Sequence, residues 1–219
     1  MAVIHNTTMN PGKLELLATW LPTRPWYRGT AAGPEPVKAG GFRLDDPEGE
    51  VGLEFMVVAD VSGPEPVAYH VPVTYRGAPL DGAEEGLIGT SEHGVLGRRW
   101  VYDGAHDPVW VERLLALFRG EAEPQQQSVS GTPDPSVARH LTGPAVRPGS
   151  VADGVTEDGQ GTGITLRAGD GSGPLTVGVA RVLGEERYAE AAGAARGRIT
   201  AGWHLPDGSE HRAPFFHLG

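Results

Sequence analysis

The strongest helical pattern in the chain covers residues 107–119. Asp107 can cap this helix, Pro108 suits its first position, and Gly120 ends it. The apolar residues between these ends recur at intervals of three and four, which is the spacing of one helix face: Val111, Leu114, Leu115 and Phe118. The pattern predicts an amphipathic helix that packs on a sheet.

A shorter helix is predicted near the N-terminus. Asn10 is placed as its cap and Pro11 in its first position, and Pro22 ends it. Its apolar positions are Leu14, Leu17 and Leu21. This spacing allows only two or three turns.

Three strands are predicted in the first half, at residues 50–61, 66–77 and 97–104, because their apolar side chains alternate. In the first, Leu53, Phe55, Val57 and Val61 share a face; in the second, Val67, Tyr69, Val71, Val73 and Tyr75 do. The turn sequence Gly-Pro-Glu-Pro between these two strands predicts antiparallel pairing.

The second half reads as short strands at residues 163–168, 174–183, 198–205 and 210–218. The sequence Pro-Asp-Gly before the last strand predicts a hairpin turn. Alanine-rich residues 184–197 allow one or two helical turns.

Taken together, these elements predict an α+β protein in which a helix packs on a twisted antiparallel sheet and a second small antiparallel β unit follows. Periodicity is lost after residue 120 and returns near residue 163. We therefore expect an α+β unit at 1–120, a linker or irregular loop at 121–150, and a small β unit at 151–219.

Composition narrows the class of function. The 219 residues include no cysteine, which excludes disulfides and thiolate chemistry, and no apolar run approaches the ~20 residues that span a bilayer. The net charge of −10 argues against a nucleic-acid partner. Of 18 basic residues only Lys13 and Lys38 are lysines. We expect a cytoplasmic protein without a membrane segment.

An aromatic cluster follows the first helix, formed by Trp20, Trp26 and Tyr27. Stacked aromatic rings bind sugars, but a cluster beside a helix end also fills the seam between helix and sheet. We favour the structural role and keep the sugar-binding role open.

Other candidate chemistry is weak. The segment Gly-Gln-Gly-Thr-Gly (159–163) lacks the lysine of a phosphate loop and is expected to be a turn. His204 and His211 can approach each other beside Glu210, but too few ligands converge for a metal. His106 is expected to fix the turn into the second helix through a backbone hydrogen bond. The adjacent acidic pairs, among them Asp45-Asp46 and Glu185-Glu186, are expected to be solvated.

Three segments, in this order, carry a resemblance to a known family: "WLPTRPWYRG" (20–29), "YHVPVTYRGAPL" (69–80) and "WVYDGAHDPVWVERLLALF" (100–118). Over residues 13–120 the chain resembles the N-terminal cap of actinobacterial maltokinases. The resemblance implies a helix on a curved antiparallel sheet. In complete maltokinases this cap precedes a kinase-like region that phosphorylates maltose with ATP and magnesium.

The chain departs from the complete enzymes. It has no lysine after Lys38, no His-Arg-Asp loop and no Asp-Phe-Gly sequence, so the phosphate-holding and metal-holding groups of a kinase are missing. We therefore expect no catalytic residues, no cofactor and no metal. The preferred interpretation is a non-catalytic binding or regulatory protein linked to α-glucan or trehalose metabolism, with a protein or a maltose-type sugar as partner.

Two alternatives stay open. One is a sugar kinase whose catalytic lobe comes from a second chain. The other is a carbohydrate-binding module that uses Trp20 and Trp26.

The missing kinase groups lead to a prediction about activity. The purified chain alone is expected neither to bind Mg-ATP nor to transfer phosphate to maltose, glucose or glucosamine, because phosphoryl transfer depends on positioned cations. Isothermal titration with ATP and a coupled ADP-release assay measure this. Turnover that scales with protein concentration and is lost when one acidic residue is removed would identify a kinase.

Overall fold

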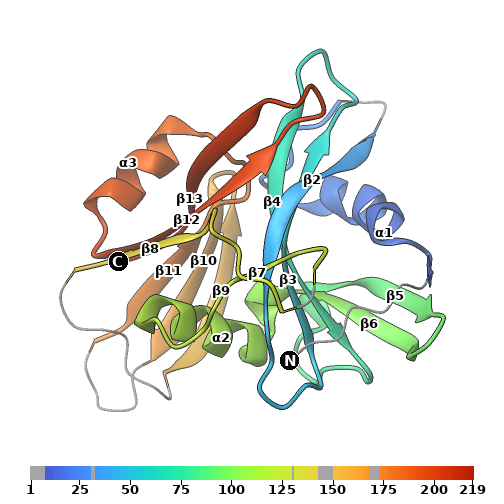
Figure 1. The fold of residues 1–219 in the computed structure, drawn as a ribbon, viewed down its shortest axis with the longest axis horizontal. Helices are drawn as coiled ribbons and strands as arrows, with labels where there is room; N and C mark the ends of the chain where they lie inside the picture. Colours follow the sequence, from blue (N-terminus) through green and yellow to red (C-terminus); the bar gives the residue numbers. More distant parts are fainter. Residues whose placement is uncertain (1–7, 31–32, 130, 143–149, 168–172) are drawn as a thin grey trace.

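The computed structural model describes residues 8–30, 33–129, 131–142, 150–167 and 173–219 (Figure 1). The described residues form one open sheet, mostly antiparallel, together with three α-helices, so the predicted α+β class is confirmed. The helices are α1 (Lys13–Trp20), α2 (Pro108–Arg119) and α3 (Glu186–Ala194).

The main path of the sheet runs in the order β1-β5-β6-β4-β3-β2-β12-β13-β11-β10-β9. The strands, in chain order, are β1 (Met9–Asn10), β2 (Pro36–Leu44), β3 (Gly52–Asp60), β4 (Val67–Arg76), β5 (Leu87–His93), β6 (Gly97–Asp103), β7 (Gln125–Gln126), β8 (Ala138–Leu141), β9 (Val151–Asp158), β10 (Gly161–Arg167), β11 (Leu175–Val179), β12 (Gly197–His204) and β13 (Glu210–Leu218). The short strands β7 and β8 pair with β2 and β12.

The pair β3–β4 is antiparallel as predicted, and β3 is buried on both faces. One face, including Phe55 and Val57, joins the core under α2, whereas Met56 and Val58 join a second core under α1. A strand covered on both sides needs apolar residues at successive positions. This explains the nearly continuous apolar run of β3.

Helix α2 confirms its sequence pattern at both ends. The Asp107 carboxylate accepts a hydrogen bond from the Val109 N–H at 2.9 Å, and Gly120 ends the helix at a φ of 81°, a conformation that favours glycine. Leu114, Leu115 and Phe118 are buried in the core that α2 shares with the sheet. The helix therefore stands where its apolar stripe predicted.

Helix α1 begins later than predicted, and Asn10 is not its cap. Asn10 lies in β1, where it pairs with Glu92 of β5, so its backbone is committed to the sheet. The helix begins at Lys13 after Gly12, whose N–H donates to the Glu15 carboxylate at 2.7 Å. The predicted end is correct, because a 3₁₀ turn over Leu21–Thr23 contains Pro22.

In the C-terminal part the predicted strands are present as β10 to β13, and the hairpin between β12 and β13 is confirmed. The Leu205 N–H donates to the Ser209 carbonyl at 3.0 Å, and Gly208 adopts a positive φ of 85° inside the turn. The helical turns at 184–197 are confirmed as α3. The sequence patterns missed β2, β5 and β9, together with the short strands β1, β7 and β8.

Residues 121–150 contain β7 and β8 but no α-helix within their described part. The division into units at 1–120, 121–150 and 151–219 stays a prediction. The structure shows that β12 pairs with β2 at Trp203 and Gly40, and that one apolar core contains residues of β3, α2, β10 and β13. Side chains from both halves of the chain therefore share one interior.

A fully buried ion pair also lies in this interior. Arg181, in the segment after β11, donates to the carboxylate of Asp103 at the end of β6 at 2.5 Å, and both side chains are buried. The same guanidinium donates to Thr162 of β10 at 2.7 Å and lies 3.7 Å from the Glu157 carboxylate of β9. The pair joins the first half of the sheet to the second.

The main chain around Arg181 reinforces this junction. The His70 N–H of β4 donates to the Arg181 carbonyl at 3.0 Å, and the Leu183 N–H donates to the Ala68 carbonyl at 2.9 Å. Burial, together with the charge of Arg181, lowers the pKa of His70 to about 3. The His70 ring is therefore neutral at pH 7 and packs as an aromatic group, with its centroid 4.6 Å from that of Phe215.

Candidate ligand-binding site

The structure places the aromatic cluster inside the protein. Trp20 is 6% exposed and Trp26 is 1% exposed. Their ring centroids lie 5.7 Å apart in an edge-to-face arrangement, and Trp26 lies 5.9 Å from Tyr69 of β4. The two indoles fill the space between α1 and the sheet, so their faces are not offered to a sugar in this conformation.

Polar atoms at the margin of the cluster are also occupied. The Trp26 indole N–H donates to the Glu157 carboxylate at 3.0 Å, and the Tyr27 hydroxyl donates to Asp60 at 3.0 Å. Burial, followed by the hydrogen bond to Asp60, raises the pKa of Tyr27 well above its ordinary value. The cluster is therefore packed between α1 and the sheet, and the polar atoms of Trp26 and Tyr27 are hydrogen-bonded within the protein.

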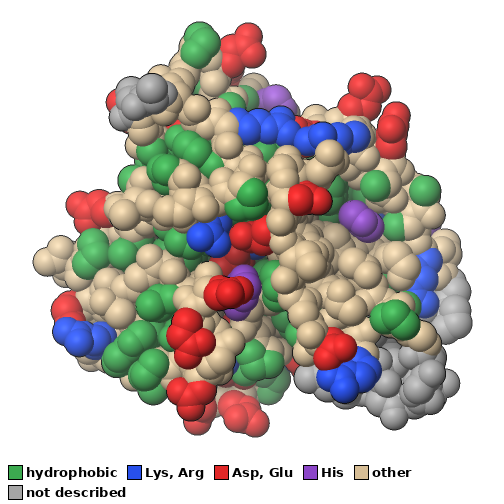
Figure 2. Space-filling view, turned by 180° about the vertical axis from the view of Figure 1, so that it is seen from behind, with side chains coloured by type: hydrophobic (Ala, Val, Ile, Leu, Met, Phe, Trp, Pro, Cys, Tyr) green, Lys and Arg blue, Asp and Glu red, His purple; other side chains and the backbone are tan. Residues whose placement is uncertain are grey.

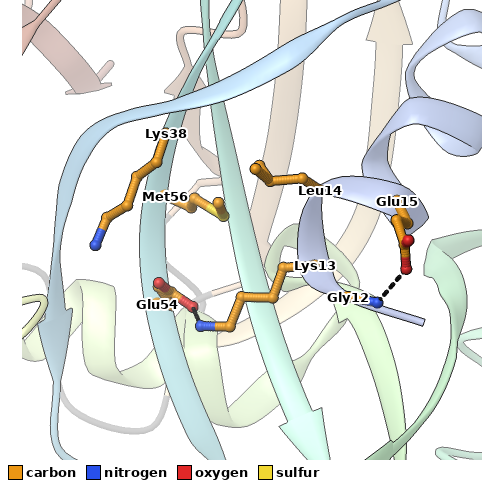
Figure 3. A pocket seen from close by; sticks show the side chains of 7 residues that line it. All are labelled: Gly12, Lys13, Leu14, Glu15, Lys38, Glu54 and Met56. Atoms are coloured by element: carbon orange, nitrogen blue, oxygen red, sulfur yellow. Dashed lines mark hydrogen bonds and ion pairs between the residues drawn. The ribbon is translucent and has the colours of Figure 1, made fainter. Parts of the chain in front are cut away.

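A different site is open to solvent. A pocket of about 400 Å³ lies between the start of α1 and strands β2 and β3 (Figure 3). Its lining residues are Gly12, Lys13, Leu14, Glu15, Lys38, Glu54 and Met56. We call it the lysine pocket, because it contains both lysines of the chain.

Glu54 of β3 is the buried polar centre of the lysine pocket, with a side chain only 6% exposed. Its carboxylate accepts hydrogen bonds from Lys13 of α1 at 2.6 Å, from the Tyr75 hydroxyl of β4 at 2.5 Å and from the Gln127 amide at 2.5 Å. These donors come from three separate segments. Glu54 therefore fixes the position of the Lys13 ammonium as well as the local packing.

The charge state of Glu54 follows from these contacts. Burial raises the pKa of the carboxyl, but the charge of Lys13 and the three hydrogen bonds outweigh burial and hold the pKa below its ordinary value. The Lys13 ammonium also lies 4.8 Å from the centroid of the Tyr75 ring. At pH 7 the pocket therefore contains an ionised carboxylate and a fixed ammonium.

The remaining walls give the pocket a second cation and an apolar side. In the view of Figure 3, Lys38 extends from β2 on one side of Glu54, and Lys13 reaches Glu54 from the other side. Its ammonium donates to the Ser128 hydroxyl at 3.2 Å. Leu14 and Met56 line the pocket as apolar side chains. A small ligand with a polar end and a less polar body matches this distribution.

Sequence reasoning did not find this site, although two signals were present. Glu54 interrupts an apolar strand, and a carboxylate in such a run needs partners if it is buried. The two lysines stand out among 18 basic residues, but 25 positions separate them, and only the sheet brings β2 beside β3. The distant partner Gln127 comes from a segment without periodicity.

The histidine candidates lie on the surface of the β12–β13 hairpin. His204 Nε2 lies 3.3 Å from the Glu210 carboxylate, whereas His211 stacks on Trp203 at 5.5 Å between centroids. Within the described part of the chain, no three acidic or histidine side chains are grouped so as to hold a metal.

Other weak candidates have structural roles. Of the segment 159–163, which was expected to be a turn, only residues 159–160 form the turn between β9 and β10, whereas Gly161 to Gly163 belong to β10. The turn into α2 is held by Asp103, whose carboxylate accepts from the Ala105 N–H at 3.1 Å, and by the Asp107 cap. Asp46 was expected to be solvated, but it is buried and accepts hydrogen bonds from the Glu50 and Val51 N–H groups at 2.9 Å. The backbone N–H groups of this loop have no strand partner there, and the Asp46 carboxylate supplies their acceptor.

Comparison with known proteins agrees with the resemblance seen in the sequence. Residues 20–107 match the family model of the maltokinase N-terminal cap domain, which confirms the resemblance over these residues. The matched region is less than half of the chain and runs from the end of α1 to the cap of α2. A search of curated proteins finds no match. No helix in the described ranges is long and apolar enough to cross a membrane.

The buried aromatic cluster leads to a stability prediction. Trp26→Ala is expected to lower the free energy of unfolding by roughly 3–5 kcal/mol, because a large buried ring leaves a cavity. Calorimetric melting of the variant measures the structural role, and a titration with maltodextrin measures the sugar-binding role. A variant that melts like the wild type and loses only maltodextrin affinity would show that Trp26 is a sugar platform.

Glu54 leads to a prediction about acid stability. Because its pKa is lowered in the folded protein, ionised Glu54 stabilises the fold above its ordinary value of 4.5, and this stabilisation is lost as the pH falls through the folded value. Glu54→Gln is therefore expected to lose less stability than the wild type between about pH 5 and about pH 3. Urea unfolding at a series of pH values measures the slopes. Equal slopes would mean that Glu54 is not held ionised.

Proposed function

We propose that this chain is a non-catalytic binding protein built around a maltokinase-cap-like region, and that the lysine pocket is its ligand site. Its ligand is a small saccharide of α-glucan or trehalose metabolism. The region related to the maltokinase cap is shown by the family match. The binding role and the ligand are inferences from the pocket.

The observation that carries a binding role over catalysis is the state of the buried carboxylates. General acid–base or metal chemistry needs a carboxylate that is free to meet a substrate or an ion. Here each one is engaged by groups that hold the fold. Among the described residues, the buried carboxylates are Asp46, Glu54, Asp60, Asp103 and Asp107. The partly buried Glu157 is engaged in the same way by the Trp26 indole.

The lysine pocket has the features of a small-molecule site. Its volume of about 400 Å³ lies in the range of typical ligand pockets, about 300–1,000 Å³. Ammonium and carboxylate groups stand at one end, and Leu14 and Met56 supply an apolar wall. Sugars present hydroxyl groups beside apolar C–H faces, so this combination suits them.

The surface charge supports the same class of partner. Among the described residues on the face shown in Figure 2, acidic and basic side chains are interspersed. The net charge of −10 adds a general repulsion of nucleic acids. These properties favour a small ligand over the polyanionic backbone of a nucleic acid.

A titration with maltose tests the proposed function. The wild type is expected to bind maltose, and Lys38→Trp is expected to lose binding at least about tenfold, because the indole occupies the opening of the pocket. Lys38 is exposed, so the variant is expected to melt like the wild type. Arg98→Trp, at an exposed position of β6, is the matched control and is expected to bind normally. Equal maltose affinity in all three proteins, or no binding to the wild type, would overturn the proposal.

A further inference from the structure

We propose that the lysine pocket binds the phosphate group of a small phosphate monoester through the ammonium groups of Lys13 and Lys38. This inference rests on the proposed function and deepens it, because it makes the preferred ligand a phosphorylated sugar.

The distribution of cations is the first argument. The chain carries a net charge of −10, and 16 of its 18 basic residues are arginines. Its only two lysines nevertheless line one pocket. Lysine presents a compact ammonium whose three donors can rotate, which suits a tetrahedral oxyanion approached from more than one side.

The second argument is the number of donors that remain available. Lys13 has three N–H groups, and one of them donates to the Glu54 carboxylate at 2.6 Å. Its side chain is 39% exposed, so solvent or a ligand can reach it. Lys38 donates to the Ser128 hydroxyl, which is a neutral acceptor, and among the described residues no carboxylate forms an ion pair with its ammonium.

The balance of charge at the polar end favours an anion. Lys13 and Lys38 contribute two positive charges and Glu54 one negative charge, so this end of the pocket is net positive. The other acidic lining residue, Glu15, points away from this end and accepts from the Gly12 N–H at 2.7 Å (Figure 3). The start of α1 is therefore already capped, and the positive charge of the pocket comes from the two ammonium groups.

Glu54 has a positioning role in this arrangement. Its bonds to Tyr75 and Gln127 fix the carboxylate, and the carboxylate in turn fixes Lys13. A cation that is already ordered loses less conformational entropy when a ligand binds. Leu14 and Met56 line the pocket beside this polar end, so we expect them to contact the uncharged body of the ligand and to favour a monoester over free phosphate.

The presence of two lysines allows a direct measurement on the unmodified chain. Protein labelled with ¹³C at the lysine ε-carbons gives two lysine signals, one for each residue. We titrate it at constant ionic strength with glucose 1-phosphate, inorganic phosphate, glucose and maltose. Both signals are expected to shift with glucose 1-phosphate, with an affinity at least about tenfold higher than that for glucose, because charge-assisted hydrogen bonds are added.

Variants assign the effect to the pocket. Lys38→Ala is expected to lower the affinity for glucose 1-phosphate about tenfold, and Lys38→Arg is expected to retain part of it, because the charge is kept. Arg98→Ala removes an exposed cation of β6 outside the pocket and is expected to bind like the wild type.

The outcomes separate this inference from the proposed function. Lysine shifts with maltose and glucose but no gain from phosphate would overturn the phosphate site and leave the saccharide site standing. Shifts with glucose 1-phosphate and phosphate, without binding of maltose, would support the phosphate site and contradict the saccharide ligand. Unchanged signals with all four probes, or an equal loss in Lys38→Ala and Arg98→Ala, would overturn the phosphate site.

Discussion

The buried guanidinium of Arg181 is the group on which the rest of the structure depends. It is fully enclosed, and its charge is balanced by Asp103 from the first half of the chain and by Glu157 from the second. Removing one partner of such a pair typically costs 3–5 kcal/mol, because the remaining charge stays buried. The Arg181 carbonyl also accepts from β4, so both its side chain and its main chain join the two halves.

The aromatic seam is part of the same arrangement. Glu157 accepts from the Trp26 indole at 3.0 Å, and the Arg181 guanidinium lies 5.2 Å from the centroid of the Trp26 ring. The cluster that follows α1 is therefore tied to β9, more than 120 positions later in the chain. In contrast, the lysine pocket lies at the start of α1, where the ammonium of Lys13 is still partly exposed to solvent. The lysine pocket therefore keeps polar groups that can still bind a ligand, whereas those of the aromatic seam are bonded within the protein.

Much of the fold follows from local patterns in the sequence. Helix α2 was predicted from Asp107 to Gly120, because its cap, its apolar stripe and its C-terminal glycine all lie within 14 residues. The pairing of β3 with β4 and the last hairpin were predicted for the same reason. Local patterns did not reveal β9, whose exposed and acidic positions resemble a loop, or the correct start of α1, which depends on the pairing of Asn10 with β5.

The site was harder to predict, because its geometry is made by contacts between distant residues. Trp20 and Trp26 were visible as a cluster, and the structural role was favoured from their place beside a helix end. The convergence of Lys13, Lys38 and Glu54 requires the pairing of β2 with β3 and the packing of α1 over them. No local pattern encodes this arrangement.

Amide hydrogen exchange in the wild type and in Asp103→Ala tests the central claim most directly. If the buried ion pair joins both halves into one cooperative structure, the core amides of β3 and β4 and those of β12 and β13 exchange in the wild type with the same free energy of opening. In Asp103→Ala both groups are expected to lose protection together. If the amides of β12 and β13 open independently in the wild type, or if the variant loses protection in only one half, the account is contradicted.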